Sequence, residues 1–169
     1  MSKLQVLSLT LLLVGLLALG SGLAAEESQG TSALWSVEGC WIKLEVHSPA
    51  NLGTITGPGQ VIESTGNPVA LTTNCGKWVL EIEATDVKAP ISAEEVLEDF
   101  EWRVGECPSG VTCQDTYVNF PGLNERMTAA EPKHEIFEAK FGMDYRYTSD
   151  MHDLPGDYRV ELLYTVTTP

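Results

Sequence analysis

Three histidines and many carboxylates are the residues of this chain that could carry acid–base chemistry. The 169 residues include 24 Asp and Glu but only 10 Lys and Arg, which gives a formal net charge of −14. His47, His134 and His152 lie in no nucleophile motif, and the sequence contains no G-x-S-x-G. A Ser–His–Asp site can be assembled from residues far apart in the sequence, so a secreted hydrolase stays an alternative. We expect a chain that is not an enzyme and that needs no cofactor.

Pairs of carboxylates could instead serve glycoside hydrolysis, in which two acids converge on one bond. Glu81 with Glu83 and Glu94 with Glu95 are such pairs, but no feature singles either of them out. Glu81 and Glu83 have the same parity in a strand-like run, so we interpret them as the solvated side of a sheet.

One acidic loop, residues 150–157, has the composition of a weak calcium site. Asp150, Asp153 and Asp157 could supply carboxylate oxygens, which Ca²⁺ prefers as ligands. The loop lacks the D-x-D-x-D-G order of an EF-hand. We therefore assign no metal and interpret the segment as a solvated loop, with His152 at the surface.

Tryptophans could form a stacking platform for a ligand. Trp41 has the opposite parity to Ile42, which predicts an exposed ring and makes it the best candidate for a binding aromatic. Packing at a sheet edge is the alternative role for Trp41. Trp78 and Trp102 have the parity of the apolar positions around them and are predicted to be buried.

Four cysteines indicate two disulfides if the chain is exported. Cys107 and Cys113 flank the turn-rich segment PSGVT, which favours their pairing and leaves Cys40 for Cys75 among the three arrangements that four cysteines allow. Parity places the second bridge inside the core, between two strands. A zinc site is the competing interpretation, but no C-x-x-C or neighbouring histidine pair supplies the usual ligand spacing.

The first residues have the pattern of a secretory signal peptide, which we place at residues 1–25. Lys3 precedes the apolar run LLLVGLLA, and small residues follow at the expected cleavage site. Because Lys3 is the only charged residue of this segment, its removal changes the net charge from −14 to −15. An uncleaved anchor is the alternative. Residues 26–33 are small and polar, which is typical of a flexible leader.

The remaining segment, residues 34–169, alternates apolar and polar residues with the period of two that is typical of half-buried strands. Ser92 and Glu95 form a capping box, which predicts one short helical turn near residues 92–98. Turn formers, among them Gly66-Asn67-Pro68, separate the runs. We expect one all-β domain, an immunoglobulin-like antiparallel β-sandwich. The alternating runs are residues 42–46, 69–73, 78–85, 100–104, 137–147 and 158–167.

Two of these runs resemble the WxL domains of bacterial secreted proteins. Trp78 and Leu80 match the first Trp-x-Leu motif of that family, and Tyr158 follows Gly156 as in the strand that carries the second. Tyr164 and Val166 stand where the second motif has Trp and Leu. The resemblance implies a β-sandwich and non-covalent attachment to cell-wall peptidoglycan.

The expected function is therefore that of a secreted or cell-surface protein, non-enzymatic and associated with the cell envelope, which binds a cell-wall polymer or an envelope protein. A pilus-like or coat-like subunit that assembles through sheet edges is the alternative. Its acidity argues against binding to nucleic acid or anionic lipid, because both need a basic patch. We expect no membrane span after cleavage, because the sequence shows no second long apolar segment. The pattern fixes neither the ligand nor the oligomeric state.

Overall fold

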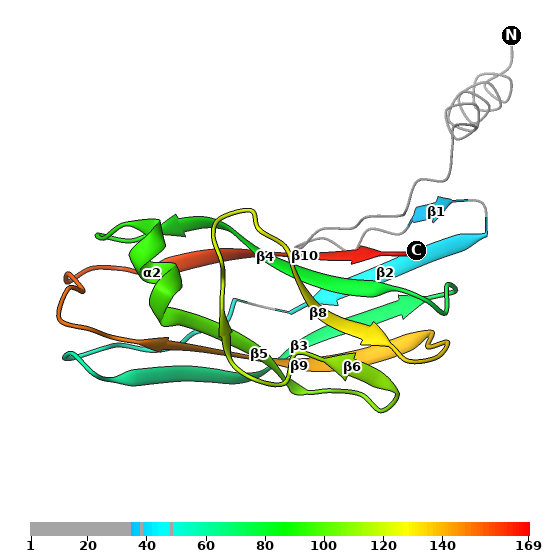
Figure 1. Cartoon of the computed structure of the whole chain (residues 1–169), viewed down its shortest axis with the longest axis horizontal. Helices are drawn as coiled ribbons and strands as arrows, with labels where there is room; N and C mark the ends of the chain where they lie inside the picture. Colours follow the sequence, from blue (N-terminus) through cyan, green and yellow to red (C-terminus); the bar gives the residue numbers. More distant parts are fainter. Residues whose placement is uncertain (1–34, 38, 48) are drawn as a thin grey trace, which may run out of the picture.

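The computed structural model of the chain describes residues 35–37, 39–47 and 49–169. The predicted signal peptide and the predicted leader lie outside the described residues. Within them the protein is an all-β sandwich of two antiparallel sheets, which confirms the predicted fold class (Figure 1).

The larger sheet has six strands in the order β1-β2-β3-β9-β5-β7. Its members are β1 (Trp35–Val37), β2 (Cys40–Val46), β3 (Val61–Thr73), β9 (Glu138–Thr148), β5 (Phe100–Glu106) and β7 (Val118–Asn119). Neighbouring strands all run antiparallel. The long β3–β9 ladder forms the centre of this sheet, and its register aligns Leu71 with Ala139 and Val69 with Phe141.

The smaller sheet has four strands in the order β10-β4-β8-β6. Its members are β10 (Arg159–Thr167), β4 (Val79–Lys88), β8 (Met127–Pro132) and β6 (Val111–Cys113). β10 pairs with β4 so that Tyr164 lies opposite Ile82 and Val166 lies opposite Leu80. One extra residue of β4, Thr85, interrupts the ladder between Glu161 and Leu162.

One short helix, α2 (Ala93–Asp99), connects β4 to β5 and so links the two sheets. Its first turn is the predicted capping box: Ser92 Oγ accepts from the Glu95 amide, and the Glu95 carboxylate accepts from the Ser92 amide at 3.0 Å. Figure 1 places α2 and the β9–β10 connection at one end of the sandwich and β1 with the C-terminus at the other. Among the described residues, no helix is long and apolar enough to cross a membrane.

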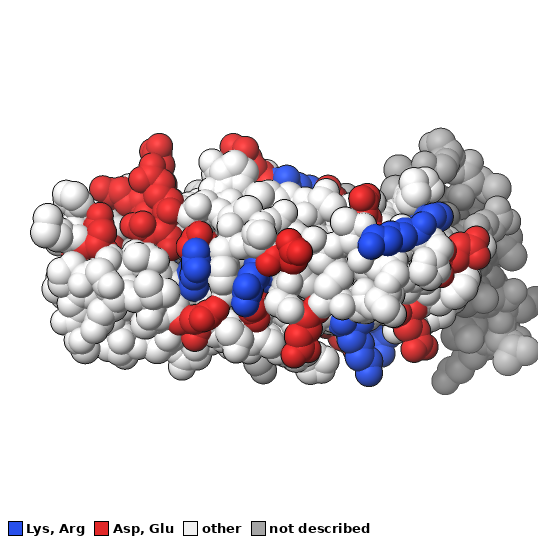
Figure 2. All heavy atoms as spheres, turned by 60° about the horizontal axis from the view of Figure 1, so that its bottom comes forward, with Lys and Arg blue, Asp and Glu red and all other residues white. Residues whose placement is uncertain are grey.

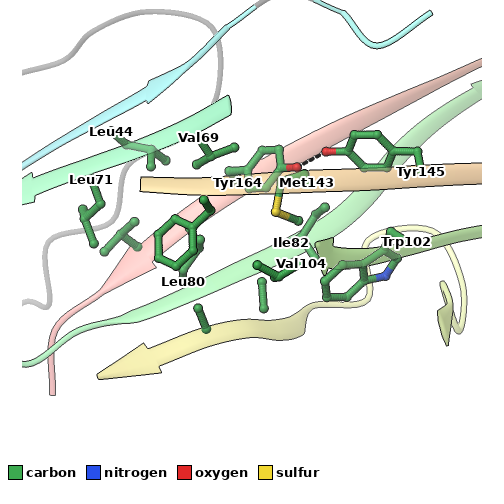
Figure 3. Packing of buried hydrophobic residues seen from close by; sticks show 14 of the residues in the cluster. Leu44, Val69, Leu71, Leu80, Ile82, Trp102, Val104, Met143, Tyr145 and Tyr164 are labelled. Carbon is green, nitrogen blue, oxygen red and sulfur yellow. Dashed lines mark hydrogen bonds between the residues drawn. The ribbon is translucent and has the colours of Figure 1, made fainter. Parts of the chain in front are cut away.

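The core lies between the sheets and includes most of the apolar positions that the alternation predicted. Ile42, Leu44, Val69, Leu71, Trp78, Leu80, Ile82, Trp102, Val104, Met143, Tyr164 and Val166 are buried. Several of them interdigitate from both sheets in Figure 3. Trp78 packs edge-on against Phe141 with ring centroids 6.0 Å apart, and its indole N–H donates to the Ile136 carbonyl at 2.8 Å.

The prediction that Gly66-Asn67-Pro68 is a turn between strands was wrong. These residues lie inside β3, at an irregularity of its ladder with β9. Gly66 has a φ of 68°, which a glycine adopts without strain. The side-chain amide of Asn67 donates to the backbone carbonyls of Ser64 and Met143, so a side chain replaces part of the interrupted ladder. The strand therefore starts eight residues before the predicted Val69.

Two further expectations about burial were also wrong. Phe137 shares the parity of the apolar positions in the run at residues 137–147, which predicts burial, but it precedes β9 and is 49% exposed. Glu83 was assigned to the solvated side of a strand, but it is buried. Arg126 covers it, with Nε 3.6 Å from a Glu83 carboxylate oxygen.

Both predicted cysteine pairs lie at disulfide distance. The Cα atoms are 5.6 Å apart for Cys40 and Cys75, and 6.2 Å apart for Cys107 and Cys113. The β2–β3 register, in which Ile42 lies opposite Thr73, brings Cys40 opposite Cys75 just beyond the end of the ladder. The bridge is half-buried at this end rather than inside the core as predicted, because Cys40 starts β2 and Cys75 follows β3.

Candidate functional site: the acidic end

A cavity of about 360 Å³ opens at the end of the sandwich that carries α2. Two segments far apart in sequence form its walls: α2 together with Ile91, two residues before it, and the β9–β10 connection. The lining residues are Ile91, Glu95, Glu98, Asp99, Asp150, His152 and Asp153. Figure 2 shows acidic side chains gathered at this end of the molecule.

On the helix side, the capping box fixes the orientation of Glu95. Its carboxylate accepts hydrogen bonds from the Ser92 hydroxyl at 2.7 Å and from the Ser92 amide at 3.0 Å. These two bonds lower the pKa of Glu95, since both favour the ionised form. The first turn of the helix thus presents a fixed negative charge to the cavity.

On the loop side, Asp150 holds the chain in a tight turn. Its carboxylate accepts from the His152 amide at 2.6 Å, from the Asp153 amide at 3.2 Å and faces the His152 Nδ1 at 3.0 Å. Asp153 returns the contact by accepting from the Asp150 amide at 3.1 Å. The bonds from His152 lower the pKa of Asp150, and the Asp150 carboxylate raises the pKa of His152.

Two tyrosines anchor this loop to the sandwich. The Tyr147 hydroxyl donates to Asp153 at 2.6 Å, and the Tyr158 hydroxyl donates to the Leu154 carbonyl at 2.8 Å. The two rings lie 5.9 Å apart. Burial, and then the bond to Asp153, raises the pKa of Tyr147, so the hydroxyl stays protonated and keeps donating.

The surroundings of Asp99 disfavour the ionised form of its carboxylate. It is half-buried at the end of α2, and desolvation raises its pKa, with further contributions from Asp150, Asp153 and Glu98. No basic residue lies in the last turn of this helix. The cavity therefore carries negative potential that a cationic group entering it would relieve.

The candidate calcium ligands are only partly brought together. Asp150 and Asp153 line the cavity, whereas Asp157 does not. Across residues 35–37, 39–47 and 49–169, no three His, Cys, Asp or Glu side chains are grouped closely enough to hold a metal ion. Asp150 and Asp153 instead use their oxygens to hold the loop, which a sequence pattern alone does not reveal.

The candidate binding aromatic, Trp41, lies at the opposite end of the sandwich. It is half-buried in β2, and its amide donates to the Asn74 side chain at 2.5 Å. The Thr73 hydroxyl and the Asn74 amide both donate to its carbonyl. Trp41 thus does not contribute to the acidic cavity.

The residues that carry the WxL resemblance belong to the hydrophobic core or pack against it. Trp78, Leu80, Tyr164 and Val166 are buried, and Tyr158 is half-buried against the core cluster. A ligand cannot reach buried side chains without unfolding the sandwich. Any partner must therefore be contacted by other residues.

A second polar cluster, on the outer face of the larger sheet, was not predicted. Arg103 Nε and Nη2 each lie 2.9 Å from one oxygen of the buried Asp144, whose other oxygen accepts from the Gly66 amide at 2.9 Å. The Arg103 and Arg146 guanidinium groups both pack against the Tyr117 ring, 4.5 Å and 3.9 Å from its centroid. Basic and acidic groups lie side by side along this part of Figure 2. All these charged groups have partners, so we interpret the cluster as one that stabilises the sheet.

No family model, curated protein or solved structure matches the chain.

Proposed function

We propose that this chain is an exported, non-enzymatic protein of the cell envelope that acts by binding, with a cell-wall polymer or an envelope protein as its partner. The observation that carries the proposal is the acidic cavity between α2 and the β9–β10 connection. Its polar lining consists of carboxylates and one imidazole on preorganised segments, which suits binding of a cationic or hydrogen-bonding group.

The cysteines support the proposed location. Two cysteine pairs at disulfide distance favour an oxidising compartment, and the predicted signal peptide agrees with that. The hydrolase alternative is less well supported: His152 and Asp150 form a pair at 3.0 Å, but the cavity lining includes no serine, threonine or cysteine for them to activate.

Retention on purified cell wall and on an envelope protein fraction tests the proposal. We expect the purified chain to be retained, and retention to weaken when Glu98→Gln removes one exposed charge from the cavity. Glu138→Gln, which also removes an exposed charge but at the start of β9, is the matched control. Failure to retain the unsubstituted chain on either material, at low and high salt, would overturn the proposal.

A structural subunit that assembles through sheet edges is the second candidate. Among the described strands, β10 pairs only with β4 and has nine residues, whereas the edge strands β1, β6 and β7 have three, three and two. Long edges are the ones that pair with other chains. Sedimentation velocity separates the two candidates, because a strictly monomeric chain contradicts assembly.

A further inference from the structure

Large apolar side chains are exposed at the same end of the sandwich as the acidic cavity. Met151 is 84% exposed, Leu154 is 53% exposed and Val61 is 58% exposed. Of the five large apolar residues exposed in the described part of the chain, three therefore belong to this end; the others are Leu123 and Phe137. Exposed apolar residues that gather in one place mark contact surfaces, whereas single ones are ordinary.

These apolar residues adjoin cavity-lining residues along the chain, or lie beside the strand that leads to them. Met151 lies between Asp150 and His152 in the loop that forms one wall, and Leu154 follows Asp153. Val61 starts β3 next to the end of β9, where the Ser149 amide donates to the Gln60 carbonyl at 2.9 Å. We call the surface formed by Val61, Met151, Leu154 and the cavity lining the acidic end.

The loop that presents Met151 and Leu154 is held in place, so the surface is preformed. Asp150 and Asp153 exchange hydrogen bonds across it, Tyr147 of β9 donates to Asp153, and Tyr158 donates to Leu154 within the loop. Gly156 packs against Pro90 so closely that a Cβ at residue 156 would lie 3.0 Å from a Pro90 ring carbon. A preformed surface loses little conformational entropy when a partner docks.

We propose that the acidic end is a docking surface for a basic protein segment in which Lys or Arg residues alternate with large apolar ones. Charge complementarity selects this occupant. The cavity carries five carboxylates against one imidazole, so a Lys or Arg head group gains from entering it. The apolar side chains of the segment cover Met151, Leu154 and Val61, removing apolar surface from water. The inference rests on the binding function proposed above and identifies the partner as a protein segment.

The probe is a short synthetic peptide of alternating Lys and Leu, titrated into the purified chain by calorimetry. Two matched peptides replace every Leu by Ser or every Lys by Glu. We expect binding of the first peptide alone, because the surface offers apolar contact and negative charge together. Equal binding of the Lys–Ser peptide would show attraction to the acidic chain as a whole and would overturn the proposal.

Substitutions locate the binding surface. The double variant Met151→Ser, Leu154→Ser should weaken peptide binding by about tenfold or more, from the loss of two apolar contacts. Phe137→Ser, which removes an exposed apolar side chain outside the acidic end, is the control and should leave binding unchanged. All three side chains are exposed, so the variants should fold. Equal weakening by the control would contradict this assignment.

Charge variants and added Ca²⁺ complete the test. Glu98→Gln should weaken binding about two- to fivefold at low salt, and Glu138→Gln should have no effect. Binding of Ca²⁺ that displaces the peptide from the same residues would instead assign the cavity to a cation, and would overturn the choice of a protein segment. If the chain is retained on cell wall but does not bind the peptide, this inference is refuted and the proposed function is still supported. A chain that binds the peptide but no wall material supports the inference.

Discussion

The hydroxyl groups of Tyr145 and Tyr164 meet each other in the middle of the core, one from each sheet (Figure 3). Tyr145 belongs to β9 of the six-stranded sheet, and Tyr164 belongs to β10 of the four-stranded sheet. Both side chains are buried, so each hydroxyl satisfies the other in a place that water does not reach. This contact is a polar bond between two otherwise apolar layers.

The Tyr145–Tyr164 pair should behave as a unit when substituted. Tyr145→Phe or Tyr164→Phe alone leaves one buried hydroxyl without its partner and should cost about 1–3 kcal/mol of unfolding free energy. The double variant removes both hydroxyls and should cost less than the sum of the two single costs. Denaturant unfolding of the four proteins measures the coupling. Strictly additive costs would show that the two hydroxyls do not depend on each other.

Ionisation of Tyr145 provides a spectroscopic check on the same pair. Burial raises the pKa of Tyr145 to about 12, and the pKa of Tyr164 is raised as well by its burial. The ultraviolet absorbance of phenolate should therefore develop for these residues only well above pH 10. In the Tyr145→Phe variant the high-pH part of the titration should lose amplitude. A Tyr145 signal at an ordinary tyrosine pKa would contradict its burial.

Gly105 should not tolerate a side chain. A Cβ on Gly105 would clash with a carboxylate oxygen of Asp144, which Arg103 and the Gly66 amide hold in place. Gly105→Ala should therefore destabilise the protein by about 1–3 kcal/mol, because the charge pair must shift. Gly57→Ala is the control, since nothing lies within 4 Å of a Cβ there, and it should stay within about 0.5 kcal/mol. Thermal unfolding of both variants measures these two changes in stability.

Removal of the charge at residue 99 should stabilise the protein at neutral pH. The folded-state pKa of Asp99 is raised, mainly by desolvation, so the fold favours the protonated form. The favourable contribution of this group is present below its unfolded pKa and is lost as the pH rises through the folded value. Asp99→Asn should thus be more stable than the parent at pH 7, by up to about 0.5 kcal/mol.

The stability difference between Asp99→Asn and the parent protein should vanish in acid, because Asp99 is then protonated in both the folded and the unfolded state. Unfolding midpoints measured from neutral pH down to below the carboxylate range test this. A stability gain that persists unchanged at the lowest pH would mean that the substitution acts through packing and not through charge. Glu138→Gln, at an exposed site whose carboxylate is outside the cavity, serves as the reference variant.

The two cysteine pairs should contribute unequally to stability. Loop-closure entropy gives about 4 kcal/mol for the bridge that spans 35 residues and about 2 kcal/mol for the one that spans six. Replacing Cys40 and Cys75 together by Ser should therefore cost more than replacing Cys107 and Cys113. Denaturant unfolding compares the two variants. Non-reducing peptide mapping checks the pairing itself, and a free thiol at Cys75 would refute it.

The sandwich could be predicted from the sequence because several of its long strands alternate apolar and polar residues along the chain. The runs at residues 42–46, 78–85 and 158–167 carry that alternation themselves, and Ser92 with Glu95 marks the start of the helix. β8 could not be found this way. Its successive residues Ala129 and Ala130 are both buried, so the pattern of two is lost. β6 and β7 are too short to show any pattern, and tertiary pairing alone defines them.

The acidic end could be predicted only in parts. The loop that contains Asp150 and Asp153 and the acidic helix that contains Glu95 were both visible in the sequence. Their meeting depends on the antiparallel return of β10 beside β4, which no local pattern specifies. Asp144 shows the same limit: its parity predicts an exposed carboxylate, yet it is 4% exposed, because Arg103 of the neighbouring strand pairs with it across the sheet.

The covalent link between Cys40 and Cys75 has a mechanical consequence. A pulling force applied at the two ends of the chain would pass from Cys40 straight to Cys75 and bypass the residues between them. β2 after its first residue and all of β3 would then bear no load, so the β2–β3 pairing would persist while β4 and the later strands, including β9, were pulled away. The fully stretched protein would be shorter than its reduced form by about 120 Å, the extended length of the 35-residue separation. Oxidation thus sets how far this sandwich can be drawn out under tension.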